Sequence, residues 1–137
     1  MDDARAYPLR VVGRVESTLT RRADAPMQGR EGAPDAWIVF EDDVREAARD
    51  LVAGDDVLVL TWLHEADREV QSVHPRDDRT LPERGVFSTR SPDRPNPIGL
   101  HRVEVVEVDG LRIRVRPLEA IDGTPVVDVK PVLRGEA

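Results

Sequence analysis

Short apolar runs, separated by polar segments rich in proline and glycine, set the pattern of this chain. Strands are predicted over residues 9–15, 36–40 and 57–63, because these runs are short and rich in β-branched residues. A last short strand is predicted around Val126, Val127 and Val129. Many short strands with little helix indicate a mainly β fold, a small closed or nearly closed β-barrel.

One helix is expected after the strand at residues 36–40. Asp42 or Asp43 would act as its N-cap, since a short side-chain oxygen can accept the first backbone N–H groups. Four apolar residues fall on one face at helical spacing: Val44, Ala47, Ala48 and Leu51. Gly54 would end the helix.

Residues 102–116 predict a hairpin closed by the Asp-Gly pair at 109–110, the strongest hairpin signal in the chain. Pairing across this turn would place Val108 opposite Leu111. The alternation of apolar and polar residues breaks at 105–106, and a β-bulge there would restore it.

Composition predicts a single domain over residues 1–137 with its own core. No apolar run is long enough to cross a membrane, and no leader peptide is apparent, so we expect a cytoplasmic protein. Cysteine is absent, which fits a reducing compartment. The net charge is −7, whereas domains that bind nucleic acid are usually basic.

The segment 85–99, GVFSTRSPDRPNPIG, is expected to open as a strand over 85–89 and continue as a stiff loop. Its prolines fix φ and bias the preceding residues toward extended geometry. The loop carries Arg90, Arg94 and Asn96 on a frame with little freedom to lose on binding. This arrangement suits the recognition of a polar ligand; a plain structural connection between strands is the alternative.

This segment and a second one, IDGTPVVDVKP at 121–131, resemble the signature pair of the TsaA/TrmO-like family, and the similarity extends from Leu9 to Pro131. The resemblance implies a β-barrel S-adenosylmethionine-dependent methyltransferase. It also implies a homodimer whose acceptor is the exocyclic amine of the modified adenosine beside the anticodon of tRNA. The chain would be a short form, without the family's C-terminal tRNA-associated region.

The resemblance assigns cofactor binding to five places in this sequence. They are Pro26, Met27 and Gln28; His64 and Glu65; Arg90; Leu100; and Ile121, Asp122, Gly123 and Thr124. Arginine can bind the cofactor carboxylate through two hydrogen bonds, and amides, carbonyls and carboxylates suit the ribose and the cationic sulfur. Taken alone, Gln28 could be solvated and His64 could be a core histidine.

We expect Asp122 to accept the proton that the acceptor amine must lose. Substrate contacts are expected from Arg94, Asn96 and Lys130. Arg94 could instead fasten its loop to a carboxylate, and Lys130 could be a solvated charge. No metal is expected, because the three histidines show no ligand-like spacing and methyl transfer needs none.

Besides Val132, which stands where the family has an aromatic residue after Lys-Pro, the sequence departs from the family pattern at two places. Glu119-Ala120 stands where the family usually has Asp-Leu, and His101 stands where it has Ser. With the acidic charge, these departures leave three functions open: methylation of tRNA, methylation of a small metabolite or natural-product intermediate, and cofactor binding without catalysis.

Overall fold

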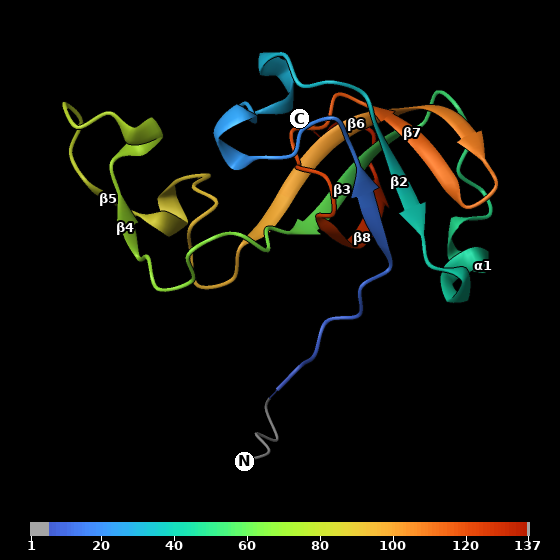
Figure 1. The fold of residues 1–137 in the computed structure, drawn as a ribbon, viewed down its shortest axis with the longest axis horizontal. Helices are drawn as coiled ribbons and strands as arrows, with labels where there is room; N and C mark the ends of the chain where they lie inside the picture. Colours follow the sequence, from blue (N-terminus) through green and yellow to red (C-terminus); the bar gives the residue numbers. More distant parts are fainter. Residues whose placement is uncertain (1–5, 137) are drawn as a thin grey trace.

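Six antiparallel strands close into a barrel in the computed structural model, which describes residues 6–136 (Figure 1). Their order around the barrel is β1-β2-β7-β6-β3-β8. The strands are β1 (Gly13–Glu16), β2 (Ala36–Phe40), β3 (Asp56–Trp62), β6 (Ile98–Asp109), β7 (Arg112–Arg116) and β8 (Pro125–Pro131). The expected mainly β barrel is therefore confirmed.

The barrel interior is filled by branched apolar side chains that alternate with outward residues along each strand. Ile38 on β2 lies opposite Ile113 on β7, and both are buried. Val59 on β3 is buried as well. Alternation with a period of two puts one set of side chains inside, which fixes the register of every pair of strands.

The first predicted strand begins later than expected. Regular pairing starts at Gly13, although the amide of Val12 already donates to the Val126 carbonyl at 2.8 Å. Residues 6–11 form no strand, and in Figure 1 this segment runs away from the barrel. The apolar pattern of residues 9–11 therefore reflects a surface segment and not a barrel strand.

The predicted helix is shorter than its pattern suggested. It consists of a 3-10 turn, η3 (Asp42–Val44), followed by α1 (Arg45–Ala48). The predicted caps are wrong, because neither aspartate caps a helix; Asp42 instead accepts a hydrogen bond from Arg45 at 2.8 Å. The apolar face is confirmed for Val44, Ala48 and Leu51, which pack against the barrel core, but not for Ala47, which is exposed.

The hairpin of β6 and β7 is confirmed, but its turn lies one residue later than predicted, so each pairing partner is shifted by two residues. Val108 pairs with Ile113 and not with Leu111, because Gly110 takes the positive φ of the turn (61°) and Asp109 remains in the strand. The bulge expected at 105–106 is present, since the register shifts between Val105 and Glu107.

Residues 64–97, which we call the arm, extend from the barrel between β3 and β6 (Figure 1, left). The arm contains a two-stranded sheet of β4 (Ser72–Val73) and β5 (Arg84–Gly85). Two 3-10 turns accompany it, η4 (Pro75–Asp77) and η5 (Val86–Ser88). The strand expected over 85–89 is thus limited to its first residue, and η5 follows directly.

A long loop, residues 17–35, crosses between the barrel and the arm. It contains two short 3-10 turns, η1 (Arg22–Asp24) and η2 (Gly29–Glu31). Among the described residues, none of the helices has the length and apolar character needed to cross a membrane.

Candidate functional site

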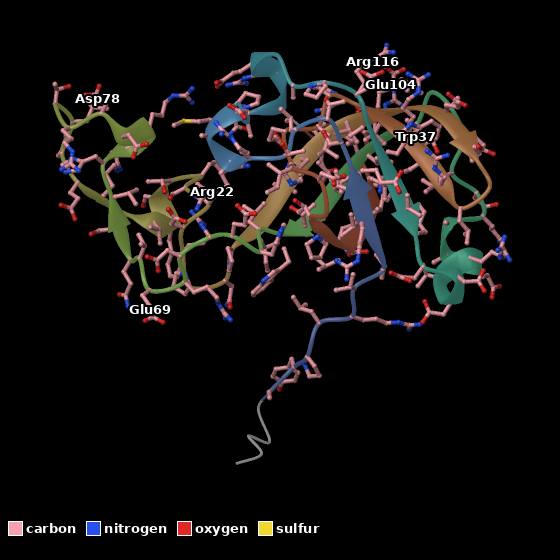
Figure 2. The ribbon with its side chains drawn as sticks, viewed as in Figure 1. Arg22, Trp37, Glu69, Asp78, Glu104 and Arg116 are labelled. Carbon is pink, nitrogen blue, oxygen red and sulfur yellow. The ribbon has the colours of Figure 1, made fainter. Side chains whose placement is uncertain are left out.

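The loop 17–35 gathers segments that lie far apart in the sequence. Arg22 donates one hydrogen bond to the backbone carbonyl of Glu65 at 3.0 Å and another to the carboxylate of Asp93 at 3.2 Å. Figure 2 shows Arg22 on the side of the barrel that faces the arm. Arg76 of the arm binds Glu31 of the same loop at 2.8 Å. The loop that carries residues 26–28 is therefore bonded to the arm on both sides of that segment, at Arg22 and at Glu31.

The Pro26–Gln28 segment leads directly into η2, and Gln28 has an extended backbone. Gln28 is the residue before this turn, and its carbonyl accepts the amide of Glu31 at 3.0 Å. Met27 is 50 % exposed, while Pro26 and Gln28 are half-buried. The side chains of this segment are thus accessible and carried by an ordered backbone.

His64 and Glu65 follow β3 directly and are both exposed. Their side chains lie 4.0 Å apart, so His64 is not a core histidine. The backbone of this pair is fixed from both sides, because Leu63 donates to the Pro97 carbonyl at 2.8 Å and Arg22 donates to the Glu65 carbonyl.

Arg90 and Arg94 occupy the same loop with opposite orientations. Arg94 turns inward and donates to the backbone carbonyls of Ser91, at 2.8 Å, and of Val86 and Thr89, both at 2.5 Å. Arg90 is exposed, and its guanidinium makes no hydrogen bond or ion pair with residues 6–136. Arg94 thus fastens the loop through carbonyls, not through a carboxylate, and Arg90 is available for a ligand.

The turn 121–124 presents Asp122 at the surface on a buried base. Ile121 and Thr124 are buried, and the Thr124 hydroxyl donates to the Ile121 carbonyl at 2.7 Å. Asp122 accepts the amide of Ser17 at 3.0 Å, and its own amide donates to the Leu19 carbonyl at 2.7 Å. Two hydrogen bonds therefore fix Asp122 while its carboxylate remains exposed.

A shallow hollow of about 580 Å³ lies beside Asp122. Most of its lining residues are polar, among them Glu16, Ser17, Asp35 and Arg114, and they are joined by Ala36 and the Trp37 ring. The guanidinium of Arg112 stacks 4.2 Å from the centre of the Trp37 ring, a cation–π contact. Hydrogen bonding to Asp35 raises the pKa of the exposed Arg116 guanidinium at the same edge (Figure 2). Sequence reasoning missed this hollow, because Trp37 appeared only as part of a strand.

The remaining predicted substrate residues lie elsewhere. Asn96 accepts a hydrogen bond from Arg68 at 3.1 Å, and Arg68 stacks 5.0 Å from the Trp62 ring. Lys130 is on β8 and pairs with Asp128 at 3.0 Å. Neither contacts Arg94, so hydrogen bonding does not unite the three residues predicted to bind substrate.

Leu100 lies on the outer face of β6, where it is 44 % exposed. Ile98 on the same face is 43 % exposed and lines a second hollow of about 500 Å³ with Trp62, Tyr7, Leu9 and Val127. This hollow is mostly apolar, in contrast to the one beside Asp122. Within residues 6–136, no group of three or more histidine, aspartate or glutamate side chains is placed to hold a metal ion.

Comparison with known proteins gives a consistent result. Residues 14–135 match the family described as the tRNA-methyltransferase O N-terminal domain. A probable S-adenosyl-L-methionine-binding protein of Methanothermobacter thermautotrophicus is 46 % identical over 123 residues, which cover 90 % of this chain and 88 % of the relative. An S-adenosyl-L-methionine-binding protein of Archaeoglobus fulgidus is 41 % identical over 89 % of this chain and 86 % of its own length.

Solved structures share the fold. A crystal structure of TrmO from P. aeruginosa superposes with a TM-score of 0.73 at 25 % identity, over 96 % of this chain. A second crystal structure of TrmO gives a TM-score of 0.75 at 26 % identity. This chain spans little more than half of these proteins, 56 % and 58 % of their lengths.

Proposed function

The chain belongs to the tRNA-methyltransferase O N-terminal domain family, and we propose that it binds S-adenosylmethionine and transfers the methyl group to an acceptor amine. One observation carries this proposal. The loop 17–35, which carries the segment 26–28, is joined through Arg22 to the Glu65 carbonyl and to Asp93 in the loop that bears Arg90. These are three of the places that the family resemblance assigns to the cofactor.

The residues at these places fit the chemistry of the cofactor. The exposed Arg90 guanidinium can bind the carboxylate of the amino-acid end through two hydrogen bonds. The amide of Gln28 and the carboxylate of Glu65 can accept hydrogen bonds from the ribose hydroxyls. Since their backbones are already fixed, little ordering is required when the ligand binds.

Methyl transfer requires little covalent chemistry from the side chains of the protein. S-adenosylmethionine supplies an already activated methyl group: the acceptor nitrogen bonds to the methyl carbon as the carbon–sulfur bond breaks, and the electron pair leaves with sulfur in S-adenosylhomocysteine. The chain must align the acceptor and exclude competing water. Asp122, exposed and fixed by Ser17 and Leu19, accepts the proton that the nitrogen releases.

This role for Asp122 is tested by Asp122→Asn. Asparagine keeps an oxygen that can accept the Ser17 amide, so the turn and the cofactor affinity should change little. Turnover should fall, because the amide cannot take the proton. Equal losses of turnover and of S-adenosylhomocysteine affinity in calorimetry would make Asp122 a binding residue instead.

Two acceptors are in contention. Family resemblance favours the exocyclic amine of an adenosine in tRNA. The charge of the chain favours a small acceptor, because the net charge is −7 and Glu16, Asp35 and Asp122 all line the hollow beside the turn. Incubation with labelled cofactor, first with bulk tRNA and then with cell metabolites, separates these acceptors. Binding of cofactor without transfer to either would indicate a non-catalytic module.

We also propose that the chain forms a homodimer through the apolar outer face of β3 and β6. Ile98 and Leu100 are each more than 40 % exposed there, beside the apolar hollow at Trp62. A second copy would cover this face with two-fold symmetry. Light scattering at micromolar concentration should give twice the chain mass, and Ile98→Glu should reduce it to a monomer; a monomeric wild type contradicts the proposal.

A further inference from the structure

Three polar side chains form a hydrogen-bonded chain that begins at two buried, neighbouring strand positions of the barrel. Thr61 on β3 is fully buried, and its hydroxyl lies 2.7 Å from Nε2 of His101 on β6. His101 is 6 % exposed, and its Nδ1 is hydrogen-bonded to Glu119, which is 14 % exposed. We call these three residues the polar triad. His101 and Glu119 are two of the departures from the family pattern noted in the sequence, and here they contact each other.

The hydrogen bond to Glu119 determines which ring nitrogen of His101 carries a proton. An ionised carboxylate can only accept, so Nδ1 of His101 carries a proton and donates to Glu119. Both ring nitrogens and both partners are therefore used. A buried polar group that loses its partner is costly, so the triad has one favoured geometry.

The backbone is shaped to admit the triad. Thr61 pairs with Gly99, and the His101 ring folds over this glycine to reach the threonine. A Cβ atom at Gly99 would lie 2.4 Å from the Thr61 hydroxyl oxygen and 2.7 Å from Nε2 of His101. Gly99, the last residue of the NPIG sequence, thus leaves the space in which the triad forms.

The outer end of the triad contacts the loop proposed to bind the cofactor. A Cβ atom at Gly29 would lie 3.3 Å from Oε2 of Glu119 and 3.2 Å from Cγ of Pro117. Gly29 follows Gln28 directly and its carbonyl accepts the amide of Ala33 at 3.0 Å. The second carboxylate oxygen of Glu119 therefore lies against the segment that ends at Gln28, while the first is held by His101.

From this arrangement we infer that His101 and Glu119 are positioning residues: the triad holds the segment 26–29 against the barrel and so sets the affinity for the cofactor. This inference rests on the proposed function for its ligand, but not for the positioning itself. Neither residue touches the reacting atoms; each acts through Gly29 and Gln28.

A matched pair of substitutions tests the link at His101. The amide of asparagine ends near the position of Nδ1, whereas the amide of glutamine reaches the position of Nε2. His101→Asn therefore keeps a donor to Glu119 and loses Thr61, while His101→Gln does the reverse. Affinity for S-adenosylhomocysteine in calorimetry should fall about tenfold in His101→Gln and in Glu119→Ala, and less than about threefold in His101→Asn.

A control variant separates positioning from general stability. Glu107→Ala removes a carboxylate on β6 that binds Arg114 at 3.1 Å and lies outside the triad. Its affinity for S-adenosylhomocysteine should equal that of the wild type. If thermal unfolding temperatures fall in the triad variants while all affinities stay the same, the triad is only structural and the inference is wrong.

A second readout needs no ligand and no core substitution. Gly29→Ala presses on the Glu119 carboxylate from outside, so the imidazole ¹⁵N signals of His101 should move. Conversely, Glu119→Ala should speed hydrogen exchange at the Ala33 amide, while Glu107→Ala should not. Unmoved His101 signals and unchanged exchange overturn the inference. If the wild type fails to bind S-adenosylhomocysteine but exchange responds, positioning stands and the proposed function fails.

Discussion

The barrel and the arm are stabilised in different ways. The barrel has a core of thirteen buried apolar residues drawn from its strands and from the segment after β7. Within the arm, only Val86 and Pro97 are fully buried. The arm is instead joined by arginines, as Arg68 donates to the Pro95 carbonyl and Arg94 to three carbonyls of its own loop.

This difference predicts that the barrel and the arm differ in stability. Burial of apolar area contributes most of the stability of a small domain. Exposed hydrogen bonds and ion pairs contribute little each and open easily. Of the proposed cofactor residues, His64, Glu65 and Arg90 lie on the arm, whereas Leu100 lies on the barrel strand β6.

The largest expected effect is on the barrel core. Ile38→Ala removes a fully buried side chain opposite Ile113, and we expect the free energy of unfolding to fall by about 2–5 kcal/mol. Phe87→Ala is the matched change in the arm; the ring is 85 % exposed, so the loss should stay below about 0.5 kcal/mol. Urea denaturation measures the free energy of unfolding of both variants. Comparable losses would contradict the expected difference in stability between the barrel and the arm.

The barrel was predictable from the sequence, and the arm was not. Strands such as 36–40 can be recognised from their own short apolar runs, and the Asp-Gly pair at 109–110 predicts its hairpin. Residues 64–97 lack an apolar pattern, because their order comes from long-range bonds such as that of Arg22 to Asp93. No local sequence signal specifies such pairs.

The next effect concerns binding. Arg90→Ala removes the exposed guanidinium proposed to bind the cofactor carboxylate, and we expect a loss of about 2–4 kcal/mol in affinity for S-adenosylhomocysteine. The unfolding temperature should not change, because Arg90 makes no ion pair within residues 6–136. Unchanged affinity in calorimetry would remove Arg90 from the site.

Arg94→Ala should instead lower the local stability of the arm. It removes the guanidinium donor from the carbonyls of Val86, Thr89 and Ser91, although the Val86 carbonyl keeps the amide and hydroxyl of Thr89 as donors. We expect a local loss of about 1–3 kcal/mol, confined to the arm. Hydrogen exchange should quicken at the Thr89 amide, while amides of β2 and β7 stay protected. Loss of protection throughout the barrel would show that the two regions unfold together.

The same pair of arginines shows how far the sequence specifies a site. Arg90 and Arg94 are four positions apart in one motif, and nothing in their side chains distinguishes a ligand contact from a structural bond. Orientation decides it, and orientation depends on where the backbone of η5 turns. The contact of His101 with Glu119 was hidden for the same reason, since it joins residues on separate segments.

The smallest expected effect is a titration within the arm. The pKa of Asp78 lies below its ordinary value of 3.8, first because the Thr80 hydroxyl donates to its carboxylate at 2.5 Å and second because the Thr80 amide donates as well. A lowered pKa means that this carboxylate favours the folded arm above pH 3.8 and loses that contribution as the pH falls through its folded value.

Thr80→Ala removes the first donor and keeps the second, so the midpoint of the Asp78 carboxyl ¹³C signal should rise part of the way toward 3.8. His74→Gln, which removes only the weakest of the causes, should move the midpoint less. The unfolding temperature at pH 7 should be the same in all three proteins, because Asp78 is fully exposed and the barrel core carries the stability. A Thr80→Ala protein that melts earlier at pH 7 would show that the arm contributes to the stability of the whole chain, and the contrast between the two regions would then have to be drawn less sharply.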